Sequence, residues 1–246
     1  MIRTGTRKSA WQAGERGVLG IVGGMGALAT AAFLRTIYEY NAADTEQDLP
    51  RCIVDCDPTI PDRTDAIRSG VEQDVRSQLA DSVNGLVRRG ATRIVLVCVT
   101  AHHFIDTSQQ SVRERVVSLV DTIIGEVELA QGPLLMLSTE GTRKARLFEN
   151  SARWPQVADR AVMPAPPVQR KIHEIVYRIK KEGATQHVAK SVSDLIRQHG
   201  CVGAIFGCTD FHLLTADLIA QPDMSRSTVI DPLRSIAMNL KHLLEK

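Results

Sequence analysis

Short, continuous apolar runs recur along this chain, and most of them precede a segment with helical spacing. The runs cover residues 17–22, 51–55, 94–98, 132–137, 204–208 and 228–230. Helices are expected at residues 29–40, 71–89, 111–129, 166–182, 186–199, 213–219 and 233–245, with a shorter one that ends near residue 149. Strands that are apolar on both faces and alternate with helices are typical of parallel sheets covered on both sides. The pattern therefore predicts an α/β fold.

Two segments do not fit this alternation. Residues 57–70 are polar and hold two prolines, which favours an irregular loop, and residues 154–164 show no clear pattern. Residues 1–16 are basic and polar without the apolar core of a signal peptide, and we expect a disordered extension there.

The alternation restarts near residue 132, which suggests an internal duplication. Two glycine turns, two thiols and two cations recur in register. The pairs are Gly26 and Gly141, Cys98 and Cys208, and Arg63 and Lys180. Each cysteine follows its glycine by 72 or 67 residues, and each cation follows it by 37 or 39. We expect two similar parallel-sheet halves that divide near residue 131, with a site in the cleft between them.

Cys98 and Cys208 are the candidate reactive groups. Each ends an apolar run 8 residues after a glycine, and each precedes an expected helix start. Backbone N–H groups there can stabilise a thiolate or hold a substrate carboxylate. A thiolate and a thiol on opposite faces of one carbon could invert its configuration by removing and returning a proton. The alternative is that both cysteines are inert core residues, because free cysteine is often buried.

Histidines follow both cysteines, and they leave further alternatives open. His102 and His212 each lie four residues after a cysteine. They could polarise the thiols, or the two Cys-x-x-x-His pairs could form a tetrahedral zinc site. Cys52, Cys56 and Cys201 lack this setting and are interpreted as core or structural residues.

The turn at residues 24–29 matches the G-x-G-x-x-A fingerprint of dinucleotide-binding proteins, with Asp55 as the expected acidic partner. The same turn could instead hold a substrate carboxylate. Arg63 and Lys180 are the cations that we assign to substrate, because arginine binds carboxylates in a bidentate manner. For both, a solvated surface charge is the alternative.

The composition argues against several classes of protein. The 246 residues carry a formal net charge of +2 with interspersed signs, and only 4% are aromatic, so a nucleic-acid groove is not expected. The apolar runs are too short to span a membrane. Five cysteines form an odd set that favours free thiols in a reducing cytoplasm.

Several motifs together resemble the aspartate/glutamate racemase family, the branch that works without pyridoxal phosphate. The resemblance runs from about residue 18 to residue 240. It is carried by residues 20–26 (GIVGGMG), 60–64 (IPDRT), 98–102 (CVTAH), 139–142 (TEGT), 172–173 with Lys180, and 207–209 (GCT).

The resemblance implies two pseudo-symmetric parallel-sheet α/β domains, residues 17–130 plus 226–246 and residues 131–225. They would be related by a pseudo-twofold axis, with the C-terminal helix returning to the first domain. It implies Cys98 and Cys208 as catalytic acid/bases, no cofactor and no metal, and frequent homodimers. Thr100 and Thr209 would hold the α-carboxylate, with Met25 and Thr139 also at the site. Arg63 and Lys180 match the side-chain carboxylate ligands of aspartate-selective members.

The chain departs from the family pattern next to both thiols. Val99 replaces an asparagine that helps to bind substrate, and residues 210–212 (DFH) replace the usual Glu-Leu-Pro. We expect a cytoplasmic racemase of aspartate, with glutamate second. The alternatives are a dicarboxylate isomerase or decarboxylase, or a binding protein for an amino acid or nucleotide.

Overall fold

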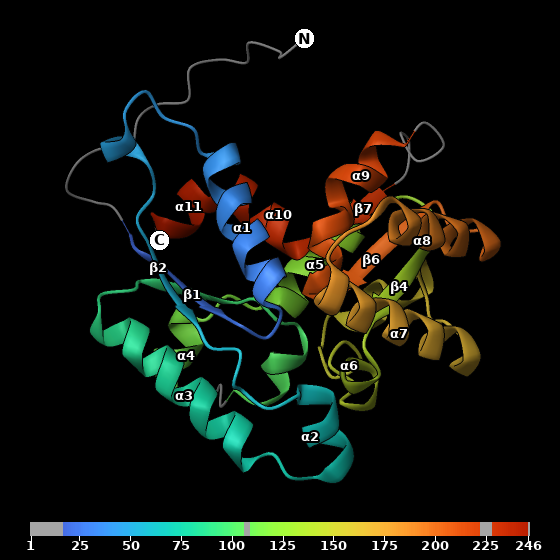
Figure 1. Ribbon diagram of the computed structural model, residues 1–246, viewed down its shortest axis with the longest axis horizontal. Coiled ribbons are helices and arrows are strands. Elements are labelled where there is room, and N and C mark those ends of the chain that lie inside the picture. Colours follow the sequence, from blue (N-terminus) through green and yellow to red (C-terminus); the bar gives the residue numbers. More distant parts are fainter. Residues whose placement is uncertain (1–16, 106–108, 222–227, 246) are drawn as a thin grey trace.

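The computed structural model describes residues 17–105, 109–221 and 228–245. They form two parallel sheets flanked by helices (Figure 1). The predicted disordered extension, residues 1–16, lies outside the described residues. No helix in the described part of the chain has the length and apolar character needed to cross a membrane.

The first sheet has the strand order β2-β1-β3. Its strands are β1 (Leu19–Gly23), β2 (Cys52–Cys56) and β3 (Arg93–Leu96), and the helices of this half are α1 (Ala27–Tyr40), α2 (Arg63–Ser69), α3 (Gln73–Arg88), α4 (Gln110–Arg115) and α5 (Leu119–Leu129). All pairings are parallel, as the continuous apolar runs predicted.

The second sheet has the order β5-β4-β6-β7. Its strands are β4 (Leu134–Ser138), β5 (Ala161–Val162), β6 (Gly203–Gly207) and β7 (Thr228–Ile230), and its helices are α6 (Glu140–Lys144), α7 (Pro166–Glu182), α8 (Gln186–Gln198) and α9 (Thr215–Ala220). The chain ends with α10 (Pro232–Met238) and α11 (Leu240–Leu244). In both sheets the first strand of the half lies between the next two, which is the arrangement a duplication predicts.

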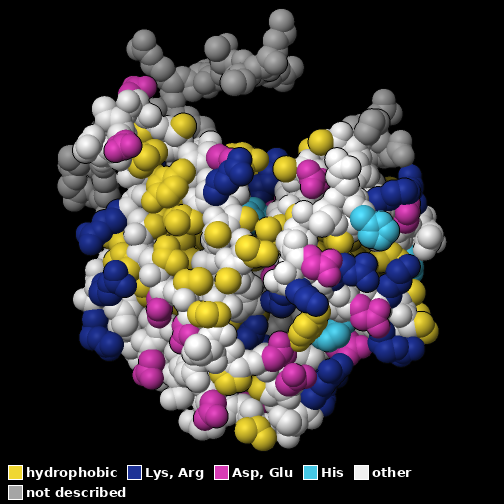
Figure 2. Space-filling model, in the orientation of Figure 1, with side chains coloured by type: hydrophobic (Ala, Val, Ile, Leu, Met, Phe, Trp, Pro, Cys, Tyr) yellow, Lys and Arg dark blue, Asp and Glu magenta, His cyan; other side chains and the backbone are white. Residues whose placement is uncertain are grey.

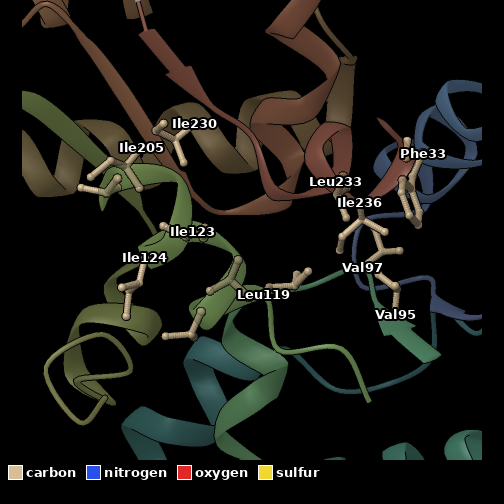
Figure 3. Close-up of a cluster of buried hydrophobic side chains, with 14 of the residues drawn as sticks. Phe33, Val95, Val97, Leu119, Ile123, Ile124, Ile205, Ile230, Leu233 and Ile236 are labelled. Carbon is tan, nitrogen blue, oxygen red and sulfur yellow. The ribbon is translucent and has the colours of Figure 1, made fainter. Parts of the chain in front are cut away.

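Alternate residues along the strands point to different cores, which confirms that the sheets are buried on both faces. Ile94 and Leu96 pack toward α3, whereas Val95 and Val97 pack toward α1 and α5. The second sheet behaves in the same way, with α7 and α8 on one face. The remaining faces of both sheets share one core with α1, α5 and α10, and Figure 3 shows this shared cluster. Because β7 pairs with β6 while α10 packs on α1, the chain end ties the halves together.

Four predicted elements are corrected. The helix expected to end near residue 149 is α6, which ends at Lys144 shortly before Arg146 with its φ of +51°. The expected loop at residues 57–70 contains helix α2, because the Asp62 side chain caps it by accepting N–H bonds from Thr64 and Asp65. The expected helix at residues 111–129 is two helices, because Val117 N–H bonds to Ile94 O at the edge of β3 and Ser118 then caps α5. The last helix is likewise divided at Asn239.

Candidate active site

The two candidate thiols lie at equivalent ends of the two sheets. Cys98 comes two residues after β3, and Cys208 comes directly after β6. Each is followed by a 3-10 helix, η2 (Thr100–His103) and η5 (Thr209–Leu214). The hydroxyl of Thr209 donates to the carbonyl of Val97 at 3.1 Å. A hydrogen bond therefore joins the two neighbours of the thiols across the two halves of the chain.

Lys180, near the end of α7, is the group that links both thiols electrostatically. Burial alone would lower the pKa of Lys180, but Asp210 and both thiols act in the opposite direction, so its pKa lies above the ordinary value. Its ammonium lies 2.6 Å from Asp210 Oδ2 and donates to the carbonyl of Met25 at 2.7 Å. Lys180 is thus part of the thiol site and not a solvated surface charge.

Arg63 lies against the same carbonyl. Its Nη2 donates to Met25 O at 2.8 Å, and its Nη1 donates to Ile60 O and Pro61 O at 3.0 and 2.9 Å. Arg63 is buried at the first residue of α2, which corrects the expected loop position. Its Nε has no hydrogen-bond partner within the described residues. Met25 therefore brings both predicted substrate cations together through its backbone carbonyl.

Three buried threonine hydroxyls form a second group between the halves. Thr100 Oγ1 lies 3.1 Å from Thr139 Oγ1 and 2.8 Å from Thr142 Oγ1, and the latter two lie 3.0 Å apart. Thr139 also caps α6 by accepting the N–H of Thr142. The structure thus joins Thr100 and Thr139, which the sequence placed at one site, and adds Thr142.

Glycines at the turns leave room for close approaches, two of which join the opposite halves. Gly24 has a φ of +87°, and a Cβ there would lie 2.2 Å from the Asp57 backbone. A Cβ on Gly26 would lie 2.3 Å from Asp210 Oδ1, and one on Gly141 would lie 2.6 Å from Thr64 Oγ1. The turn considered for a nucleotide phosphate or a substrate carboxylate is therefore faced by the Asp210 carboxylate of the other half.

Asp210 is the main residue that the site predictions missed. It is 2% exposed, and its Oδ2 accepts a hydrogen bond from Cys208 Sγ at 3.3 Å. Burial raises the pKa of the Cys208 thiol well above its ordinary value, and the charge of Asp210 raises it further. The only sequence signal was its place two residues after Cys208, where the family resemblance drew attention to a departure.

Other predicted residues lie elsewhere. Val99 is buried in the apolar core shared by the two halves, so its side chain packs and does not reach these polar groups. His102 Nε2 accepts the N–H of Leu119 at 3.4 Å, and burial lowers the pKa of His102 to about 4. His212 contacts Asp231 and Thr36. Within the part of the chain that the structure describes, neither histidine is hydrogen-bonded to a thiol, and no cluster is fit to hold a metal ion.

All five cysteines are free. Cys52 and Cys201 are half-buried, whereas Cys56 is exposed at the end of β2, so the expectation of a core or structural role is wrong for Cys56.

Comparison with known proteins agrees with this geometry. The family model described as Asp/Glu/Hydantoin racemase matches residues 22–240. The broad specificity amino-acid racemase RacX of Bacillus subtilis is 23% identical over 202 residues, which cover 79% of this chain and 86% of that protein.

Solved structures share the two-domain fold. The aspartate racemase of Picrophilus torridus has a TM-score of 0.73 at 21% identity, covering 92% of this chain and 94% of that chain. A glutamate racemase from Campylobacter jejuni has a TM-score of 0.63 at 15% identity, covering 92% and 85%. At these identities the structural similarity shows only that the fold is shared. The family model, in contrast, matches nearly the whole described chain and therefore shows family membership. The chain belongs to the Asp/Glu/Hydantoin racemase family.

Proposed function

We propose that this protein is a cofactor-independent amino-acid racemase that interconverts L- and D-aspartate, with glutamate as the second substrate. The observation that carries the proposal is the contact between the two thiol segments, in which Thr209, next to Cys208, donates to the carbonyl of Val97, next to Cys98, at 3.1 Å. The Lys180 ammonium lies 2.6 Å from the Asp210 carboxylate, which accepts a hydrogen bond from Cys208. Family membership supports racemase activity, and the match to an aspartate racemase fold supports an acidic substrate.

The reaction would need one thiolate and one thiol. The thiolate removes the α-proton from one face of the substrate, and the thiol delivers a proton to the other face. A cysteine thiol is suited to this role because its pKa of about 8.5 lies close to neutral pH. The same pair would work in reverse for the opposite enantiomer.

The carbanion is the difficult intermediate, and its charge spreads onto the α-carboxylate. The hydroxyls of Thr100 and Thr209, with the N–H groups that begin η2 and η5, are the donors proposed to stabilise it. Arg63 and Lys180 are proposed to bind the side-chain carboxylate in exchange for the Met25 carbonyl.

The test is incubation with L-aspartate and, separately, L-glutamate in deuterated water without added cofactor. We expect deuterium at the α-carbon together with the D-isomer, faster for aspartate, measured by NMR and chiral chromatography. Loss of carbon dioxide, or binding without exchange, would favour a decarboxylase or a binding protein and contradict the proposal.

We also propose a cytoplasmic homodimer. Hydrophobic side chains gather over β2 and the adjoining part of α1 (Figure 2), and β2 is an edge strand of the first sheet. Tyr38 on α1 is 37% exposed beside half-buried Cys52. Light scattering after size exclusion should give twice the mass of the 27.0 kDa chain, and Tyr38→Lys should give the monomer mass.

A further inference from the structure

The two thiols of the site are unlike in their surroundings. Cys208 Sγ donates to the carboxylate of Asp210 at 3.3 Å. Cys98 Sγ makes no hydrogen bond to any residue in the ranges 17–105, 109–221 and 228–245. The pseudo-symmetry of the fold therefore does not extend to the immediate partners of the sulfur atoms.

Two positive groups face the Asp210 carboxylate. Its Oδ2, which accepts from Cys208, also lies 2.6 Å from the ammonium of Lys180. Its Oδ1 lies against Gly26 at the N-terminus of the 14-residue helix α1 and has no hydrogen-bond partner within the described residues. A helix N-terminus carries a partial positive charge, so both ends of the carboxylate lie beside positive potential.

Building on the racemase function proposed above, we propose that Asp210 is a positioning residue that keeps Cys208 in the thiol form, so that Cys208 is the proton donor of the resting site. When Cys208 donates, its S–H bond breaks and the proton joins the carbanion electron pair in a new C–H bond. The S–H bonding pair remains on sulfur as a thiolate. That thiolate lies beside the Asp210 charge, which favours recovery of the thiol by uptake of a proton from water or from the α-carbon of the product in the reverse reaction.

The ionisable groups that act on Cys208 come from three elements. Asp210 on η5 and Cys98 beyond β3 raise the pKa of Cys208 in addition to its burial, and Lys180 on α7 lowers it. Asp210 and Lys180 therefore act on the same thiol in opposite directions, and their removal should shift the Cys208 titration in opposite directions.

The test measures the titration of Cys208 without using racemisation. In a Cys98→Ser background, alkylation of Cys208 by iodoacetamide is followed against pH by peptide mass spectrometry. We expect Asp210→Asn to move the midpoint down by about one pH unit and to raise the rate at pH 7 about tenfold, because the thiolate is the reactive form. Lys180→Met should move the midpoint up. The alkylation rate of the exposed Cys56, measured in the same sample, serves as an internal control for differences in reagent concentration or solvent.

Asp217→Asn is the matched control, because it removes the same charge from an exposed position on α9; its Cys208 midpoint should equal that of the parent. An unchanged midpoint in a folded Asp210→Asn protein would overturn the proposal, as would a downward shift in Lys180→Met. If Asp210→Asn does not fold, Asp210→Ser, which removes the same charge with a smaller side chain, is measured in its place.

Kinetics with both native thiols separate positioning from substrate binding. A positioning role predicts that Asp210→Asn lowers kcat at least tenfold with a smaller change in KM, and that it shifts the pH profile of kcat. A lower KM with unchanged kcat would instead show that Asp210 competes with substrate, and it would overturn the proposal. If no α-proton exchange is found in the unmodified protein, the racemase proposal fails, yet the alkylation result still decides the role of Asp210.

Discussion

Gly26 shows how one missing side chain allows the site to form. Its backbone is extended, with a φ of −169° that any residue can adopt, so the requirement is one of space and not of conformation. The Asp210 carboxylate takes the space of its Cβ, with Lys180 Nζ 3.4 Å from the same point. Because Gly26 has no side chain, the Asp210–Lys180 ion pair of the other half can lie directly against it.

We predict that Gly26→Ala destabilises the protein by about 1–3 kcal/mol, because the new methyl group displaces a buried carboxylate. It should also lower activity, since the Asp210 contacts to Cys208 and Lys180 would shift. Urea unfolding and the exchange assay measure both effects.

The matched control is Gly85→Ala in the last turn of α3, where a Cβ meets no atom closer than 3.9 Å. That change should stabilise the helix by about 0.5–1 kcal/mol and leave activity unchanged. If Gly26→Ala and Gly85→Ala changed stability and activity equally, the explanation that Gly26 leaves room for the Asp210 carboxylate would be contradicted.

Among the elements, α1, η5 and α10 are held together by a buried polar group near the site. His212 on η5 lies 2.6 Å from Asp231 Oδ2 through Nδ1 and 3.0 Å from Thr36 Oγ1 on α1 through Nε2. Thr215 donates to the same Asp231 oxygen at 2.7 Å. Asp231 also caps α10 by accepting two backbone N–H bonds. The histidine that follows Cys208 thus fixes the packing of three helices.

We predict that Asp231→Asn lowers the free energy of unfolding by about 3–5 kcal/mol at neutral pH, because it breaks a buried pair. Although burial acts to raise the pKa of Asp231, His212 and the hydrogen bonds hold it below the ordinary value. The stabilisation is therefore complete above the unfolded pKa of about 3.9 and is lost as pH falls through the lower folded pKa.

Urea titrations at several pH values check this prediction. The difference between the parent and Asp231→Asn should stay constant from pH 7 to pH 5 and narrow below about pH 4. Asp217→Asn on α9 should change stability by less than about 0.5 kcal/mol. If the stability difference between the parent and Asp231→Asn grew as the pH fell below 4, the proposed stabilising role of the ionised Asp231 carboxylate would be contradicted.

In the whole molecule, side-chain contacts connect the two halves through α2, α6 and α7. Tyr177 on α7 donates to Asp62 Oδ2 at 2.6 Å, and Arg68 on α2 pairs with Glu140 on α6. Burial and the Asp62 charge raise the pKa of Tyr177, so it remains a donor. Cys98 and Cys208 are 8% and 6% exposed. We predict that access to the thiols requires α2 to move away from α6 and α7.

We predict that Tyr177→Phe makes the thiols more accessible, because it removes a hydrogen bond to a charged group between the halves. If this hydrogen bond stabilises the closed arrangement of the halves by about 1 kcal/mol, its loss would make the open arrangement about five times more populated. The alkylation rates of Cys98 and Cys208 would then rise about fivefold. Tyr38→Phe, the same chemical change on α1, should leave both rates unchanged. Identical rates in all three proteins would show that these contacts do not limit access.

The sequence predicted six strands because buried parallel strands are continuous apolar runs that local composition reveals, but it missed β5, which is only two residues long. It missed α2 because the capping contacts of Asp62 outweigh Pro58 and Pro61, and it missed the break before α5 because the Val117 bond to Ile94 is long-range. The matching spacing of the two halves predicted that Arg63 and Lys180 lie near the thiols. Their contacts with the Met25 carbonyl, and the contact of Lys180 with Asp210, depend on how the two halves pack against each other, which spacing within the sequence does not reveal.

The central claim is that both Cys98 and Cys208 transfer protons to one substrate carbon. The most direct measurement is racemisation of L- and D-aspartate by Cys98→Ser and Cys208→Ser, with Cys201→Ser as the control, followed by chiral chromatography. The account predicts that each site variant loses at least about 100-fold in rate in both directions, because serine is a far weaker acid than cysteine, while Cys201→Ser retains the parent rate. Racemisation near the parent rate in either Cys98→Ser or Cys208→Ser would contradict it.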